Sequence, residues 1–248
     1  MDDAALWDCF LRLHSGLGRE APGSAAATLR ALQIAAPPEN ARVLELGCGP
    51  GAAVEALLGA RGDIHVTGLD LHAPYVAEAA KRAEAMGART RFTGVVADMS
   101  APPLSGPFET IWCEGAAYAI GVEAALRAWA PLLVPGGCVA LSEAVWLTAE
   151  PDPRARAVFA EYPGMADLAT LRARVVAAGY EPVSAFELGA EEWDNYYLPL
   201  AARCDALEDE FSATEEGRHV LDVTREEIAA RGAAGRDYGY VFIVARKP

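Results

Sequence analysis

Short apolar runs alternate with alanine-rich stretches between residues 41 and 143. The runs have the length of buried strands, and the stretches between them repeat apolar residues at helical spacing, which is typical of βα units around a parallel sheet. We expect strands over residues 42–46, 64–70, 91–97, 110–113 and 137–142. The helices expected between them cover residues 52–58, 74–86 and 122–133. The pattern predicts an α/β fold with a Rossmann-like, mostly parallel sheet.

The alternation of apolar runs and alanine-rich stretches changes after residue 143. A helix is expected over 168–178, a strand over 180–188 and a final strand over 238–246, the last two forming an antiparallel pair. With them the sheet has seven strands, the last one antiparallel. The segment 189–236 between them is too long for a structureless loop in a compact domain. Its apolar residues fall at steps of four, three and four, which predicts an amphipathic helical insertion; they are Leu200, Cys204, Leu207 and Phe211.

The first forty residues form a second attachment. Trp7, Phe10 and Leu13 lie at helical spacing, residues 14–23 are a loop, and Ser24 is a suitable N-cap for a helix. We therefore divide the chain into an N-terminal helical cap, residues 1–40, and a main domain, residues 41–248, that carries the insertion.

Charge narrows the range of partners. The formal net charge is −14, from 35 acidic and 21 basic side chains, and no run of Lys and Arg offers a basic patch. A nucleic acid would be repelled by such a surface, so none is expected as a partner. Residues 187–227 hold thirteen of the acidic side chains and three Arg. A solvated helix face explains this excess, although an amine substrate would also suit it.

Cysteine usage and the N-terminus indicate a cytoplasmic protein. The five cysteines stand far apart, without the Cys or Cys/His spacing of a zinc site, so no metal is expected. The N-terminal sequence MDDAALWDCF has neither the basic nor the apolar region of a signal peptide. No uncharged apolar run approaches the length of a membrane span. The sequence leaves the oligomeric state open.

A glycine-rich turn after the first expected strand is the strongest chemical signal. Residues 43–51 read VLELGCGPG, a strand that runs through Gly47, Gly49 and Gly51 into a helix. Such glycines let the backbone approach a ligand, while the helix N-terminus presents free N–H groups. Gly47, Gly49 and Ala52 also satisfy the dinucleotide pattern, so this turn alone leaves a nicotinamide cofactor open.

Two further acidic residues close expected strands. Asp70 ends the second strand and would accept hydrogen bonds from a ribose diol, and Asp98 ends the third, where it would accept from an adenine amine. The carboxyl ends of parallel strands face one crevice, so Glu45, Asp70 and Asp98 should converge there. A helix cap for Asp70 and a turn for Asp98 are the purely structural alternatives.

The ordered set of motifs resembles class I S-adenosylmethionine-dependent methyltransferases. The segment 43–51 is similar to the first motif of that family, and Asp70, ADM at 97–99 and VPGG at 134–137 fall where its later motifs fall. The resemblance covers roughly residues 40–145 and implies S-adenosyl-L-methionine as the cofactor. By this likeness the cofactor-binding residues are Glu45, Gly47, Cys48, Gly49, Gly51, Asp70, Leu71, Asp98, Met99 and Glu114.

A narrower resemblance is to uncharacterised bacterial small-molecule methyltransferases. It rests on an N-terminal LHSGL segment, residues 13–17, the PGS of residues 22–24, and EGAAYAIG, residues 114–121. It implies a small-molecule substrate without naming one.

Catalytic residues are harder to assign, because methyl transfer from a sulfonium chiefly requires alignment and exclusion of water. In this fold the loop after the fourth strand lies beside the reactive methyl group, which points to Glu114 and Tyr118. Three roles fit Glu114: accepting a substrate proton, orienting a substrate hydroxyl or amine, and binding the amino group of the cofactor. His14, in the N-terminal loop beside Arg19, is a further candidate base if that loop closes over the crevice.

An aromatic cluster stands at the start of the insertion, formed by Trp193, Tyr196 and Tyr197 with Asp194. It could wall a substrate pocket or hold a cation, and core packing under a helical cap explains it almost as well. We therefore expect an S-adenosylmethionine-dependent methyltransferase acting on a small molecule. A cofactor-binding regulatory module without turnover is the main alternative, and a nicotinamide-dependent oxidoreductase is a weaker one.

Overall fold

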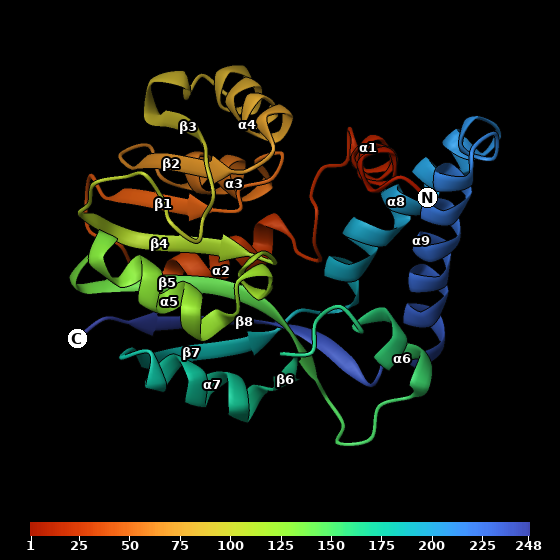
Figure 1. Ribbon diagram of the computed structural model, residues 1–248. Coiled ribbons are helices and arrows are strands. Elements are labelled where there is room, and N and C mark those ends of the chain that lie inside the picture. The colour runs from red at the N-terminus through yellow and green to blue at the C-terminus, as the bar shows by residue number, and fades with distance from the viewer.

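A single eight-stranded sheet organises the chain in the computed structural model, which describes residues 1–248 (Figure 1). Its strands are β1 (Arg42–Leu46), β2 (His65–Asp70), β3 (Phe92–Val96), β4 (Phe108–Glu114), β5 (Leu133–Trp146), β6 (Ala166–Asp167), β7 (Glu181–Glu187) and β8 (Tyr238–Arg246). The order along the sheet is β3-β2-β1-β4-β5-β8-β7, with the two-residue β6 paired to β5. The pairs from β3 to β5 are parallel, and β8 runs antiparallel to both of its neighbours.

Nine α-helices surround the sheet. They are α1 (Asp3–His14), α2 (Ala25–Ala35), α3 (Ala52–Ala60), α4 (Ala73–Ala85), α5 (Val122–Trp129), α6 (Pro153–Val158), α7 (Leu168–Ala177), α8 (Ala190–Phe211) and α9 (Glu215–Ala234). Three short 3₁₀ turns complete the list: η1 (Arg89–Arg91), η2 (Ala117–Ala119) and η3 (Ala130–Leu132). No helix combines the length and the apolar character that crossing a membrane requires.

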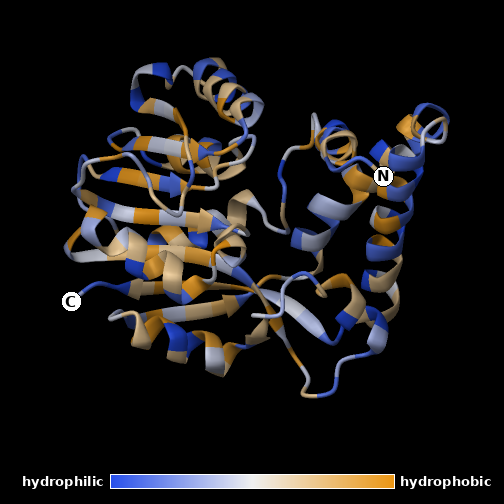
Figure 2. Cartoon of the chain, in the orientation of Figure 1, coloured by the Kyte–Doolittle hydropathy of each residue, from blue (hydrophilic) through white to orange (hydrophobic).

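The sheet separates two hydrophobic layers, because side chains alternate between its faces. Val43 and Trp112 face the layer formed with α2, α3 and α4, while Leu44 and Ile111 face the layer formed with α5 and α7. Figure 2 shows the corresponding hydrophobic residues along the central strands. The parallel strands thus read as nearly continuous apolar runs because both faces are covered.

Helices α1, α8 and α9 form a helical cap beside the carboxyl ends of the parallel strands, with α6 below them (Figure 1). The Arg203 guanidinium on α8 donates to the carbonyls of Arg12 and Leu13, over 2.7 and 3.1 Å, and so fixes the end of α1. Leu13 and Leu200 belong to the same apolar cluster as Val43. The cap therefore packs continuously with one layer of the main domain.

Most predicted elements are confirmed. The predicted α/β class is confirmed, and β1 and β8 have the predicted bounds. The sheet has eight strands where seven were predicted, because the two-residue β6 pairs with the end of β5 beyond residue 142. Two predictions about extent were also wrong. The strand expected to begin at residue 137 begins at Leu133, because backbone hydrogen bonds between Gly136, Gly137 and Lys247 continue the pairing through the Pro-Gly-Gly turn. The helix expected to reach residue 133 ends at Trp129, and the chain continues as a 3₁₀ turn containing Pro131, which lacks an N–H group.

The insertion contains two helices where the periodicity predicted one. Helix α8 ends at Phe211, and Thr214 caps α9 by accepting from the Gly217 N–H over 3.1 Å. At the N-terminus, Ser24 caps α2 as predicted, and its hydroxyl accepts from the Ala27 N–H. Helix α2 lies against β5 and β8, so of the first forty residues only α1 packs within the helical cap. The proposed domain boundaries themselves stay a prediction.

Gly51 provides a test of how tightly the first βα unit is packed. It has a φ of +93°, and a Cβ atom added there would lie 2.7 Å from both Cα and Cβ of Ala79 on α4. We expect Gly51→Ala to lower the free energy of unfolding by about 2–4 kcal/mol, since a strained backbone and a steric clash add together.

Gly87→Ala is the matched control. Gly87 also has a positive φ, +73°, but a Cβ atom there would meet nothing within 4 Å. Gly87→Ala should lower the free energy of unfolding by about 1–2 kcal/mol, because only the backbone is strained. Chemical denaturation measures both variants, and equal losses would show that the contact with α4 has no effect.

Candidate functional site

One large cavity opens between the carboxyl ends of the parallel strands and the helical cap. Its volume is about 810 Å³, and it is lined by residues of the glycine loop, the strand ends, the N-terminal loop, α8 and α9. This lies in the upper part of the roughly 300–1,000 Å³ range of small-molecule sites. The cavity is therefore large enough to hold a nucleotide-sized ligand together with a second small molecule.

The glycine loop forms one wall of the cavity. Gly47 and Gly49 have φ values of +70° and +51°, and the N–H groups of Gly47 and Cys48 both donate to the Leu69 carbonyl. A Cβ atom on Gly47 would lie 2.4 Å from the Ala116 Cβ. The loop is thus held against the end of β2 and the segment after β4, in a conformation that only glycine adopts without strain.

Asp70 at the end of β2 helps to hold this loop. Its carboxylate accepts from the Gly49 N–H over 2.9 Å and from the His72 N–H over 2.8 Å. The helix-cap role considered as the alternative for Asp70 therefore applies in part, because the Asp70 carboxylate orders the start of the next segment at His72. Each oxygen accepts one bond here, which leaves acceptor capacity toward the cavity that it lines.

Glu45 is a deeply buried carboxyl group beside the glycine loop. Only 2% of its surface is exposed, and its Oε2 atom has no hydrogen-bond partner. Burial, followed by the charges of Glu114 and Asp70, holds the pKa of Glu45 well above its usual range. A buried carboxyl without a partner is costly, so this position suits a cationic group brought by a ligand.

Glu114 at the end of β4 is held from three sides. Its Oε1 atom accepts from the Thr28 hydroxyl over 2.6 Å and from the Trp112 indole N–H over 2.9 Å. The Arg19 guanidinium lies 3.8 Å from Oε2. This arrangement fixes the carboxylate and links β4 to α2 and to the N-terminal loop.

Nearly all the predicted cofactor residues line this one cavity. Glu45, Gly47, Cys48, Gly49, Asp70, Leu71, Asp98, Met99 and Glu114 all do so. Gly51 does not line it, because its backbone lies against α4. Asp98 is exposed at the rim, where its carboxylate accepts from the Ser100 N–H over 2.7 Å, and Leu71 is 74% exposed.

The three predicted catalytic residues also reach the cavity, each with a neighbour. His14 is buried, stacks on Phe10, and places Nδ1 2.7 Å from the Glu20 carboxylate. The Tyr118 ring is partly exposed, and its centroid lies 5.5 Å from that of Tyr162. The structure thus brings them together, while their roles stay predictions.

The aromatic cluster of the insertion forms the opposite wall. Trp193, Tyr196 and Tyr197 line the cavity, and Asp194 does not. The Tyr197 hydroxyl donates to Glu227 of α9 over 2.8 Å. Tyr240 from β8 adds a further ring, 5.4 Å from that of Trp193. The three rings line the cavity and also belong to the apolar core, so the structure fits both the pocket-wall and the core-packing interpretation.

Sequence reasoning missed Glu143. It lies within β5, only 1% exposed, and lines the cavity from the sheet face opposite to that of Glu45 and Glu114. One oxygen accepts from the Ala144 N–H, and Oε2 has no hydrogen-bond partner. A charged residue inside the apolar run of residues 138–146 is a signal that could have identified it.

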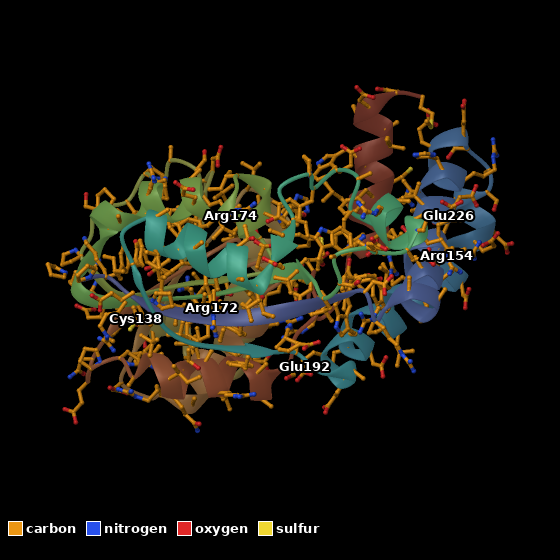
Figure 3. The ribbon with its side chains drawn as sticks, turned by 90° about the horizontal axis from the view of Figure 1, so that it is seen from below. Cys138, Arg154, Arg172, Arg174, Glu192 and Glu226 are labelled. Carbon is orange, nitrogen blue, oxygen red and sulfur yellow. The ribbon has the colours of Figure 1, made fainter.

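Burial raises the pKa of Glu143 to about 8, against the opposing effects of the Ala144 N–H, Arg174 and Tyr162. Arg174 projects from α7, which Figure 3 shows from below. Glu143 is therefore a group whose charge depends on what enters the cavity.

The comparisons with known proteins agree with this geometry. Residues 43–137 match the family model described as "Methyltransferase domain". A methyltransferase from Geobacter sulfurreducens, solved with S-adenosyl-L-homocysteine, aligns with a TM-score of 0.86 at 22% identity, over 97% of this chain and 98% of that one. A methyltransferase from Thiobacillus denitrificans was also solved with S-adenosyl-L-homocysteine. It aligns with a TM-score of 0.84 at 22% sequence identity, over 96% of this chain and 98% of that one.

The [4+2]-cyclase SpnF aligns with a TM-score of 0.76 at 20% identity, over 98% of this chain and 93% of that one. Residues 43–137 therefore resemble a methyltransferase domain, and the chain has the fold of the S-adenosylmethionine-dependent methyltransferases. The predicted fold is confirmed. The cyclase shows that the fold alone does not determine the reaction.

Glu143 generates a prediction about pH and stability. Its pKa is about 8 in the folded chain and 4.5 in its ordinary state, so the unfolded chain releases this proton first as pH rises. Its contribution to stability is therefore fully present below pH 4.5 and is lost between there and pH 8. Glu143→Gln should unfold at nearly the parent's temperature at pH 5 and be more stable by roughly 1–3 kcal/mol at pH 9. Thermal melts across this range measure the difference, and a variant less stable at pH 9 would contradict the assignment.

Proposed function

We propose that this chain transfers a methyl group from S-adenosyl-L-methionine to a small-molecule acceptor. The observation that carries the proposal is the single cavity, in which the glycine loop and the strand-end carboxylates face an aromatic wall supplied by the helical cap. One part has the chemistry of a nucleotide site, and the other has the enclosure that a small acceptor needs.

The residues present fit the cofactor. Glu45 offers a buried, unpartnered carboxyl oxygen to the ammonium group of the methionine moiety, and the narrow space at Gly47 admits backbone but no side chain. Asp70 retains acceptor capacity for the ribose diol, and Asp98 with the Met99 backbone would bind the adenine. When bound, the cofactor supplies a methyl group on a sulfonium, which a nucleophile attacks in line.

The chain's own contribution is alignment and exclusion of water. The N-terminal loop is fixed over the cavity because the Gly23 N–H donates to the Glu192 carbonyl and the Ser24 hydroxyl donates to the Glu192 carboxylate. Glu192 is labelled on α8 in Figure 3. Glu114, held by two hydrogen bonds and by the nearby Arg19, is better suited to orienting the ligands than to accepting a proton. Tyr118 and His14 would complete the wall on the acceptor side.

Calorimetric titration tests the proposal. S-adenosylmethionine and S-adenosylhomocysteine should bind saturably, and NAD and NADP should not. Preference for a nicotinamide cofactor would overturn it. Binding without transfer of labelled methyl to any acceptor would favour a regulatory module instead.

Asp70→Ala should weaken S-adenosylhomocysteine binding about 10- to 100-fold, because charge-assisted hydrogen bonds to the ribose are lost. Asp222→Ala, on the exposed side of α9 and outside the cavity, is the matched control and should bind like the parent. Circular dichroism and thermal melts establish that both variants fold. Parent-like affinity in a folded Asp70→Ala would show that the ribose assignment is wrong.

A further inference from the structure

Beyond the part that we assign to the nucleotide, the cavity is lined by aromatic rings, which we call the aromatic chamber. This aromatic chamber is formed by Tyr118, Phe159, Tyr162, Trp193, Tyr196 and Tyr240. The rings come from η2, α8, β8 and the segment after α6, so they surround the space from several sides. The faces of aromatic rings attract cations as well as apolar groups.

The charges that line the cavity are unbalanced. Arg19 is its one arginine, and no lysine lines it. Arg19 lies against Glu114, and His14 lies against Glu20. Two further carboxyl groups, the buried Glu143 and the partly exposed Glu227, have no ion pair within 4 Å. The Tyr197 hydroxyl donates to Glu227, whose pKa burial raises, with His14 acting in the opposite direction.

Glu143 is the group that remains unsatisfied. Its Oε2 atom is buried and has no partner, although its side chain lines the cavity. A carboxyl group in this position accepts hydrogen bonds from a ligand N–H at no cost in lost internal bonds, and a cationic ligand would stabilise its ionised form. The cavity also offers an anion no lysine, and its one arginine, Arg19, lies against Glu114.

We propose that the methyl acceptor is a basic amine with an apolar or aromatic body, and that Glu143 binds its nitrogen inside the aromatic chamber. This inference rests on the proposed function and specifies its substrate class. The Glu143 carboxyl releases its proton to water as the amine binds as an ammonium ion, and the ammonium ion then passes one proton to the Glu143 carboxylate. Its lone pair then forms the N–C bond as the methyl group leaves sulfur, the S–C electron pair stays on sulfur, and the product is a methylated ammonium ion. Each turnover releases one proton to water.

Three matched probes test the acceptor class. With S-adenosylhomocysteine saturating, 2-phenylethylamine, 2-phenylethanol and 3-phenylpropanoate are titrated into the parent chain by calorimetry. The amine should bind at least tenfold more tightly than the alcohol or the carboxylate. Absence of this preference, including no measurable binding of the amine, would overturn the inference.

Glu143→Gln should weaken amine binding about tenfold and leave S-adenosylhomocysteine binding unchanged. Glu150→Gln is the control, since Glu150 is exposed and lies outside the cavity. An unchanged amine preference in Glu143→Gln would exclude Glu143 as the binding group. Failure of S-adenosylhomocysteine itself to bind the parent would instead overturn the proposed function, so the two failures are distinguishable.

Proton release gives an independent readout. At pH 7 the Glu143 carboxyl holds its proton, so binding an ammonium ion should release about one proton, which titrations in buffers of different ionisation enthalpy detect. The titratable groups around it come from β4, η2, the segment after α6, α7 and β8; they are Cys113, Tyr118, Tyr162, Arg174 and Tyr240. Burial raises the pKa of Cys113 and of the three tyrosines, so these groups stay protonated at pH 7. Glu143→Gln should release no proton, and equal release by both chains would contradict the inference.

Discussion

Carboxyl groups buried where parallel strands end are the constraint on which this site depends. Glu45, Glu114 and Glu143 lie on three neighbouring strands and are largely withdrawn from water. Each therefore needs compensating donors or a raised pKa. Glu114 accepts two hydrogen bonds and lies beside Arg19, whereas Glu45 and Glu143 each keep an unpartnered oxygen. Those two oxygens mark positions where a hydrogen-bond donor would have to come from a ligand.

The same constraint explains why the N-terminal segment is part of the site. Thr28 on α2 and Arg19 in the preceding loop both contact Glu114, and Gly23 and Ser24 contact Glu192 on α8. A single stretch of chain thus joins the sheet to the helical cap. Because the donors that hold Glu114 and those that fix the cap belong to one segment, closure of the cavity and alignment of the carboxylate depend on each other.

The sequence predicted well whatever follows from local pattern. The alternation of apolar runs located the parallel strands, and the glycine turn with Asp70 and Asp98 located the nucleotide half of the cavity, because parallel strand ends must meet at one edge. Gly51 was assigned to the cofactor from its motif, yet it serves packing against α4. A glycine motif predicts a turn, but it does not predict which of the glycines contacts the ligand.

The acceptor half could not be predicted in the same way. Its walls come from α1, α8, η2 and β8, segments far apart in the chain, and no spacing rule joins them. Glu143 lies in a strand whose neighbours are apolar, and only the three-dimensional packing shows that it faces a cavity and not a protein partner. Likewise, the two helices of the insertion and their contact with α1 depend on tertiary packing.

A crystal structure of the complex with S-adenosyl-L-homocysteine tests the central claim most directly. The account predicts the ammonium group of the ligand at Glu45, its ribose diol at Asp70, and its sulfur atom opening toward the aromatic chamber and Glu143. A ligand bound elsewhere, or one whose sulfur faces away from Glu143 and is walled off from the chamber, would contradict it.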